Sequence, residues 1–173
     1  MGNQVLIKTS FFTDFYLNDL LCCQMIYRHC KKAETMDSNN KKPKHSIVWR
    51  DQPESHDYPA ASSYLCLLLP PSQVEKLLSQ LQVETITQFK AKDIFRAAQL
   101  PLLDEHNFHV ARDLSKIEQS KALSPLLLVR DLGKRHLIIA DGYHRLCAVY
   151  LHDEDALIPC QIISLTVQDL ANV

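Results

Sequence analysis

The sequence predicts a mixed α/β (α+β) domain, and three observations carry that prediction. Short apolar runs of strand length alternate with segments whose apolar residues recur at the three- and four-residue spacing of a helix. A glycine turn joins two of the apolar runs, as in a hairpin. The composition is that of an ordinary globular protein, with 46% hydrophobic and 23% charged residues among 173. We therefore expect a compact domain with a small mixed sheet and packed helices.

The expected strands are short apolar runs that end at proline, glycine or polar residues. They cover residues 64–69, 86–91, 126–130, 135–140 and 159–165. Pro70 and Pro71 would end the first strand, because proline cannot donate to a strand ladder. Gly133 marks the hairpin turn between the third strand and the fourth.

The expected helices have one apolar face and polar residues elsewhere. They cover residues 72–81, 93–98, 110–120 and 143–151, with one more turn at 167–170. Ser72 and Glu75 have the spacing of a capping box at the start of the first helix. Strands and helices thus roughly alternate along the chain.

Residues 1–45 are expected to form an N-terminal extension with a polar linker, and residues 46–173 the compact domain. The segment 31–46 is rich in lysine, asparagine and serine, which is typical of a linker. Residues 11–27 are fairly apolar, but Asp14 and Asp19 interrupt them. We therefore expect a short helix there, and neither a signal peptide nor a membrane span.

Charge and cysteine content narrow the class of protein. The net charge of −1 argues against non-specific attraction to nucleic acid, which usually requires a basic surplus. Six cysteines without a C-x-x-C pair predict neither a disulfide framework nor a zinc site of the usual spacing. We expect a cytoplasmic protein with reduced thiols and no membrane partner.

The most informative segment is residues 137–148, Leu-Ile-Ile-Ala-Asp-Gly-Tyr-His-Arg-Leu-Cys-Ala. Its apolar run is typical of a buried strand, Asp141-Gly142 of a tight turn, and the following residues of a buried helix. A helix that begins here has free backbone N–H groups, which attract an anion. His144 and Arg145 would meet a phosphate in the first turn, and Asp141 would cap the helix or hold a cation. The alternative is an ordinary turn with Arg145 in solvent.

This segment resembles the signature of the ParB/sulfiredoxin-like superfamily, in which a G-x-R-R or G-C-H-R turn opens a helix. Phe89-Lys-Ala-Lys-Asp-Ile resembles the family's first strand, and the run 113–130 its helix–proline–strand unit. The likeness covers roughly residues 86–163. It implies the family's fold, and a turn at Gly142 to Arg145 that binds nucleotide phosphates. The N-terminal half, including His56-Asp-Tyr-Pro-Ala-Ala, resembles only uncharacterised bacterial proteins that carry this module.

Two departures limit what the resemblance implies. In sulfiredoxins a catalytic cysteine precedes the His-Arg pair, and here Tyr143 stands in that place. Sulfiredoxin activity is therefore not expected, and Cys147 is expected in the core. Partition proteins of the family carry a helix-turn-helix domain after this module, whereas ten residues follow Ile163 here. DNA binding therefore ranks last among the expected functions.

Lys90, Lys92 and Asp93 form a second candidate cluster. Strand alternation would place both lysines on one face, where they would bind phosphate. Related free-serine kinases of this fold combine an acidic residue near the first strand with a D-G-x-H-R turn, which this chain reproduces at 141–145. The resemblance implies Asp93 as the base. The alternative, from the local pattern, is that Asp93 is the N-cap of the next helix.

A third polar group lies in the loop 104–109. His106 and His109 could ligate a metal together with Asp104, since imidazole and carboxylate are common metal ligands. An ordinary surface loop is the alternative.

Two functions follow from these residues. One is a nucleotide-dependent enzyme, either a phosphotransferase acting on a small hydroxyl substrate or a nucleotide hydrolase, using Mg²⁺ with ATP or another nucleotide. Its catalytic set would be Asp93, Asp141 and His144, with Asp141 also holding the metal. The nucleotide would be held by Lys90, Lys92, Gly142, Tyr143, His144 and Arg145. The other function is a non-catalytic module whose association with a protein partner is regulated by nucleotide.

Overall fold

A four-stranded mixed sheet runs through the part of the chain that the computed structural model describes, residues 46–165. The strands are β1 (Thr87–Lys90), β2 (Leu126–Asp131), β3 (His136–Asp141) and β4 (Leu157–Leu165), in the spatial order β1-β4-β2-β3. β4 is antiparallel to β1 and parallel to β2, and β2 forms an antiparallel hairpin with β3. The predicted mixed sheet and the hairpin are confirmed.

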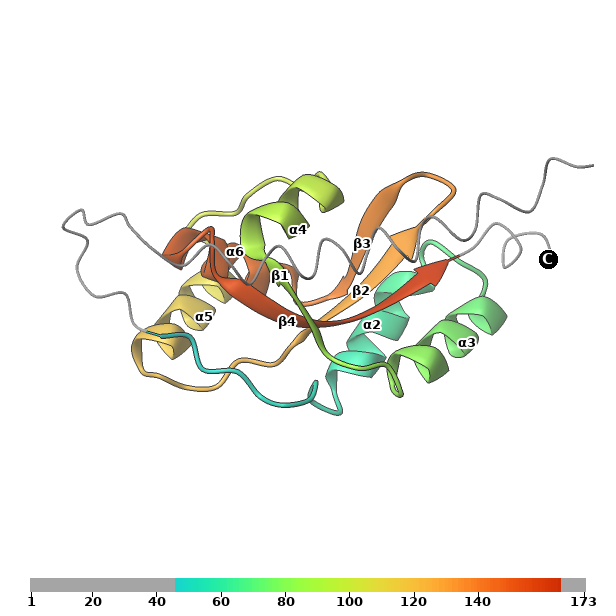
Figure 1. The fold of residues 1–173 in the computed structure, drawn as a ribbon, viewed down its shortest axis with the longest axis horizontal. Helices are drawn as coiled ribbons and strands as arrows, with labels where there is room; N and C mark the ends of the chain where they lie inside the picture. Colours follow the sequence, from blue (N-terminus) through green and yellow to red (C-terminus); the bar gives the residue numbers. More distant parts are fainter. Residues whose placement is uncertain (1–45, 166–173) are drawn as a thin grey trace, which may run out of the picture. The chain divides into compact units, whose positions relative to one another are not determined.

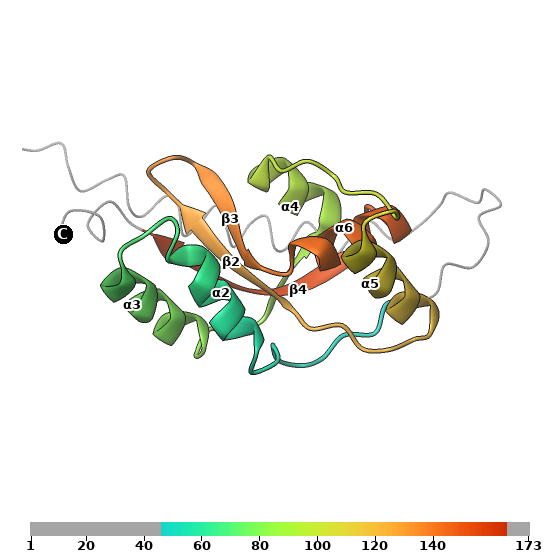
Figure 2. The same ribbon diagram turned by 180° about the vertical axis from the view of Figure 1, so that it is seen from behind.

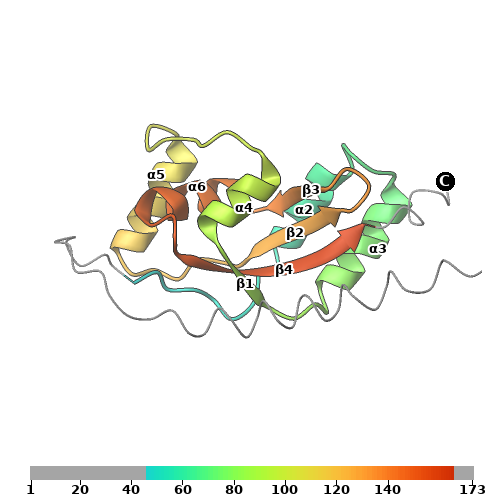
Figure 3. The ribbon, with the colours of Figure 1, turned by 45° about the horizontal axis from the view of Figure 1, so that its top comes forward.

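Within residues 46–165, five helices cover the two faces of this sheet (Figures 1 and 2). They are α2 (Asp57–Leu65), α3 (Pro71–Leu81), α4 (Ala91–Ala98), α5 (Phe108–Glu118) and α6 (Tyr143–His152). α2 and α3 pack on one face, and α4 lies on the opposite side (Figure 3). α5 and α6 contribute to the same apolar cluster as α4.

Strand alternation divides the core into two apolar layers. On β2, Leu126 and Leu128 face the cluster formed with α4, α5 and α6, whereas Leu127 and Val129 face α2 and α3. All four side chains are fully buried. Because both faces of the sheet are covered, β2 is apolar at consecutive positions and does not alternate with polar residues. The mixed α+β class predicted from the sequence is thereby confirmed.

The predicted strand at residues 64–69 is wrong. Leu65 is the last residue of α2, and residues 66–69 form the turn that follows. Ala61 and Leu65, four residues apart, are fully buried on one helical face, while Leu67 is 80% exposed. A short apolar run does not distinguish a strand from a helix end, and here the buried residues upstream of the run decide for the helix.

The predicted capping box is also wrong. α3 begins at Pro71, with Pro70 at the N-cap position, so that Ser72 lies inside the first turn. Proline suits the first position of the helix, here Pro71, because the first helical N–H groups have no intrahelical partner.

Two earlier predictions lie outside the described residues, namely the extension at 1–45 and the helical turn at 167–170. Within residues 46–165, none of the helices combines the length and the apolar character needed to cross a membrane.

Candidate functional site

The junction between β3 and α6 has the predicted strand–turn–helix form. Gly142 is the N-cap of α6 and has φ 101°, in the left-handed region that favours glycine. A Cβ atom at this position would overlap the Leu126 side chain. Glycine is therefore required both by backbone conformation and by space.

A cavity of about 670 Å³ opens beside this junction. Its walls come from α2 and its N-cap residue, the chain at 100–101, the middle of α5, the end of β3 and the first turn of α6. It is lined by Asp141, Gly142, Tyr143, His144 and Arg145, and we call it the junction cavity. The structure thus brings these five predicted site residues together.

Arg145 is held by internal contacts. Its Nη1 donates to the carbonyl oxygens of Ser124 and Pro125, at 2.7 and 2.8 Å, and its Nη2 donates to Oδ2 of Asp141 at 3.2 Å. The side chain is only 14% exposed. Both terminal nitrogens are therefore committed to fixing the chain around the cavity. The alternative of a solvent-exposed arginine is wrong.

Asp57 is a central residue of this site that the sequence analysis did not single out. Its carboxylate is buried, accepts hydrogen bonds from the Ser124 hydroxyl and from the backbone N–H of Glu54, and lies 3.6 Å from Nη2 of Arg145. His56 Nε2 lies 3.4 Å from the same carboxylate. The only local signal is an acidic residue in the first turn of a helix, which is too common to indicate a site.

Asp141 does not cap α6; it ends β3 and bonds to Arg145. Burial raises the pKa of its carboxyl above the usual 3.8, nearby Asp57 raises it further, and Arg145 opposes the shift. Among the described residues, its second oxygen, Oδ1, has no hydrogen-bond partner. One carboxylate oxygen therefore remains for a ligand.

His144 faces α5 on another side of the cavity. Its ring centroid lies 4.8 Å from that of His109. Burial lowers its pKa below the usual 6.5, and nearby His109 and Arg112 act in the same direction, while Asp113 opposes them. His144 is therefore largely neutral near pH 7. Arg112 lines the same cavity and was not anticipated.

Tyr143 donates a hydrogen bond from its hydroxyl to the carbonyl oxygen of Pro101 at 2.5 Å, which ties α6 to the chain before α5. Cys147 lies one turn further along α6 and is fully buried, as predicted. Burial raises the pKa of its thiol, so that the reactive thiolate is disfavoured.

Lys90 and Lys92 do not line the junction cavity. The predicted common strand face is wrong, because β1 ends at Lys90 and Lys92 is the second residue of α4. Both ammonium groups bind Asp155, with Nζ–Oδ1 distances of 3.0 and 2.7 Å. These two bonds lower the Asp155 pKa to about 2. The lysines therefore form an exposed ion-pair cluster of their own.

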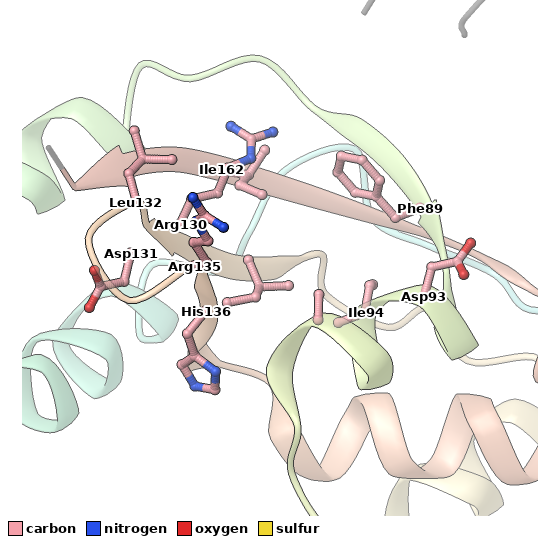
Figure 4. Close-up of a pocket in the computed structure, with 11 residues that line it drawn as sticks. Phe89, Asp93, Ile94, Arg130, Asp131, Leu132, Arg135, His136 and Ile162 are labelled. Carbon is pink, nitrogen blue, oxygen red and sulfur yellow. The ribbon is translucent and has the colours of Figure 1, made fainter.

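Asp93 also lies away from the junction cavity. It is the third residue of α4, where Lys90 holds the N-cap position, so the predicted N-cap role is wrong. Its carboxylate lies 3.4 Å from Arg96 and borders a separate groove beside α4 (Figure 4). A base acting in the junction cavity must come from another residue.

The loop 104–109 serves mainly to start α5. The Asn107 side chain accepts hydrogen bonds from the backbone N–H groups of His109 and Val110, and so caps the helix. Within residues 46–165, potential metal ligands converge instead at Glu54, His56 and Asp57, whose donor atoms lie within 4.8 Å of one another. The loop 104–109 therefore caps α5, which agrees with the alternative of an ordinary surface loop.

Comparisons with protein-family models, curated proteins and solved structures give no match to this chain. The site must therefore be interpreted from its own geometry.

Proposed function

We propose that the junction cavity binds a nucleotide or a related phosphate-bearing metabolite, as a ParB/sulfiredoxin-like site would. One observation carries this proposal: the first turn of α6 has no side-chain cap and lines the cavity. Its free N–H groups and the helix dipole favour a phosphate there. His144 and Arg112, from two different helices, also line the cavity and supply further donors.

The size and lining of the cavity support a ligand larger than phosphate. Its volume of about 670 Å³ falls within the range of roughly 300–1,000 Å³ typical of small-molecule sites. Ala60, Tyr64, Leu100 and Ile139 give it an apolar part in addition to the polar one. An aromatic base can lie against these residues while its phosphates meet α6.

Asp141 fits the predicted role of Mg²⁺ ligand. Mg²⁺ in phosphate sites is commonly held by one or two carboxylates together with phosphate oxygens and water. Asp141 offers its free Oδ1, while Arg145 fixes the carboxylate through Oδ2. When bound there, Mg²⁺ would neutralise charge on the phosphates.

For phosphoryl transfer to a small hydroxyl substrate, the proposed base is His56. It lines the cavity, and the buried carboxylate of Asp57 orients its ring. Arg145 acts as a positioning residue, because it joins Asp57, Asp141 and the backbone before β2.

Calorimetry with ADP and ATP, each with and without Mg²⁺, tests the binding proposal. We expect binding that Mg²⁺ strengthens in the wild type and in the Lys90→Ala/Lys92→Ala variant. His144→Ala and Arg112→Ala should each weaken it, by about tenfold for one lost charge-assisted contact. Equal affinity in all four proteins, or loss with the lysine variant alone, would contradict the assignment of the cavity.

A turnover assay separates the enzyme from the regulated binding module. The module alternative is favoured by one observation, the internal use of both Arg145 terminal nitrogens, which leaves this cation unable to follow a moving phosphoryl group. A phosphorylated product that disappears in His56→Ala at unchanged nucleotide affinity would establish the enzyme. Nucleotide binding without any product would establish the module.

We also propose a cytoplasmic location. Cys66, Cys147 and Cys160 carry free thiols, as in proteins of reducing compartments.

A further inference from the structure

β3 is an edge strand with an unpaired outer side. It pairs with β2 alone in the order β1-β4-β2-β3, and within residues 46–165 no backbone hydrogen bond joins it to any other element. Ile138 retains 8% exposure, whereas Val129, its partner on β2, has none. Such an edge presents free N–H and C=O groups to which another strand can pair.

An apolar groove lies on the α4 side of the sheet, and its lining includes the first two residues of β3 together with residues of α4 and of the other three strands (Figure 4). Phe89, Ile94, Leu137 and Ile162 form its apolar surface, and its volume is about 270 Å³. That volume lies below the usual range for a small-molecule site, roughly 300–1,000 Å³. It suits one large apolar side chain. We call this the α4 groove.

One end of the α4 groove is basic. Figure 4 shows Arg130 and Arg135 at the same end, and Phe89 and Asp93 at the other. Arg130 and Arg135 are exposed, and within residues 46–165 neither forms an ion pair; Arg130 makes a 3.4 Å contact with the Ser164 hydroxyl. Asp131 lines the groove too, but its carboxylate accepts the backbone N–H of Lys134. Two guanidinium groups without acidic partners favour an anionic ligand.

We propose that β3 and the α4 groove form a docking surface for an extended acidic peptide segment of a partner protein. The peptide pairs with the outer edge of β3, places one large apolar side chain in the groove, and sets its acidic residues against Arg130 and Arg135. A second copy of this chain does not supply the same match. The only acidic residue of its β3 is Asp141, which is already bound to Arg145. The α4 groove and its two arginines share no lining residue with the junction cavity, which reaches only the end of β3, so the arginine variants test this proposal separately from phosphate binding.

Selection from a random peptide library tests the proposal. The full chain is presented to displayed peptides about twelve residues long, long enough to span a strand and its flanks. We expect enrichment of peptides with one large apolar residue flanked by aspartate or glutamate. The affinity of an enriched peptide, measured by fluorescence anisotropy, should fall at least about tenfold in Arg130→Glu/Arg135→Glu. It should stay unchanged in Lys121→Glu, which alters an exposed lysine outside the groove.

Backbone methylation of the enriched peptide tests strand pairing. In one set of alternate residues the amides face β3, so N-methylation there should abolish binding, while methylation of the other set should have little effect. The absence of enriched acidic peptides would overturn the proposal. So would binding that is indifferent to the double arginine variant or equal for the two methylated sets. Dimerisation through β3 in sedimentation, lost in Leu137→Lys but kept in Arg130→Glu/Arg135→Glu, would assign the edge to a second copy instead.

Discussion

Nη2 of Arg145 lies 3.6 Å from Oδ1 of Asp57, a carboxylate with only 2% of its side chain exposed. The two residues start different helices on different sides of the sheet, α6 and α2. The same guanidinium holds Asp141 and the backbone before β2. This contact therefore links three segments around the junction cavity, and its loss has consequences for both stability and binding.

Arg145→Ala is expected to destabilise the fold by about 3 kcal/mol. The variant removes the cation that accompanies a buried carboxylate and leaves two carbonyl oxygens without their donor. Denaturant unfolding measures the change. Arg112→Ala is the matched control, because Arg112 is 54% exposed and should change the free energy of unfolding by no more than about 0.5 kcal/mol. Equal stabilities of the two variants would contradict a structural role for Arg145.

Gly142→Ala is expected to cost about 2 kcal/mol or more. An alanine at φ 101° adopts a backbone conformation that L-residues avoid, and its Cβ collides with Leu126. Thermal unfolding of Gly133→Ala provides the comparison, since Gly133 has no positive φ and its added Cβ would sit in ordinary contact at 3.4 Å. A melting temperature for Gly142→Ala as high as that of Gly133→Ala would show that the turn tolerates a side chain.

Asp141→Asn is expected to shift the pH dependence of stability. The folded state raises the Asp141 pKa above 3.8, so folding favours the protonated carboxyl. That stabilising contribution is fully present below the unfolded pKa and is lost as the pH rises through the folded pKa. Asparagine does not titrate. The stability of the wild type relative to the variant should therefore fall as the pH rises above 3.8, as unfolding curves at each pH will show. A constant difference would exclude the shift.

Asp155→Asn should show the opposite trend. Lys90 and Lys92 lower the Asp155 pKa to about 2, from an ordinary value of 3.8. The stabilisation that these two lysines provide is present at pH values above 3.8 and disappears as the pH falls through about 2. Because all three groups are partly exposed, added salt should also reduce the difference between wild type and variant. A difference that survives both acid and salt would mean that Asp155 acts through packing and not through charge.

The sequence by itself determined the elements whose cause is local. The mixed class, the β2–β3 hairpin and the β3–Gly142–α6 junction follow from apolar runs of strand length and from one glycine placed where a left-handed residue is needed. The first turn of α6 could also be predicted, since His144 and Arg145 follow that glycine directly. Each of these depends on neighbours within a few residues.

Only the tertiary structure decided which polar groups share a site. Strand order inserts β4 between β1 and β2, and the chain after α6 brings Asp155 to Lys90 and Lys92, away from the junction cavity. Asp93 follows β1 to the α4 groove, while Asp57 lies beside Arg145 at the start of α2, a helix that the sequence did not predict. An ion pair between residues far apart in the chain produces no repeating pattern in the sequence. Its energy depends on the distance between the two charged groups, and the packing of both apolar layers fixes that distance.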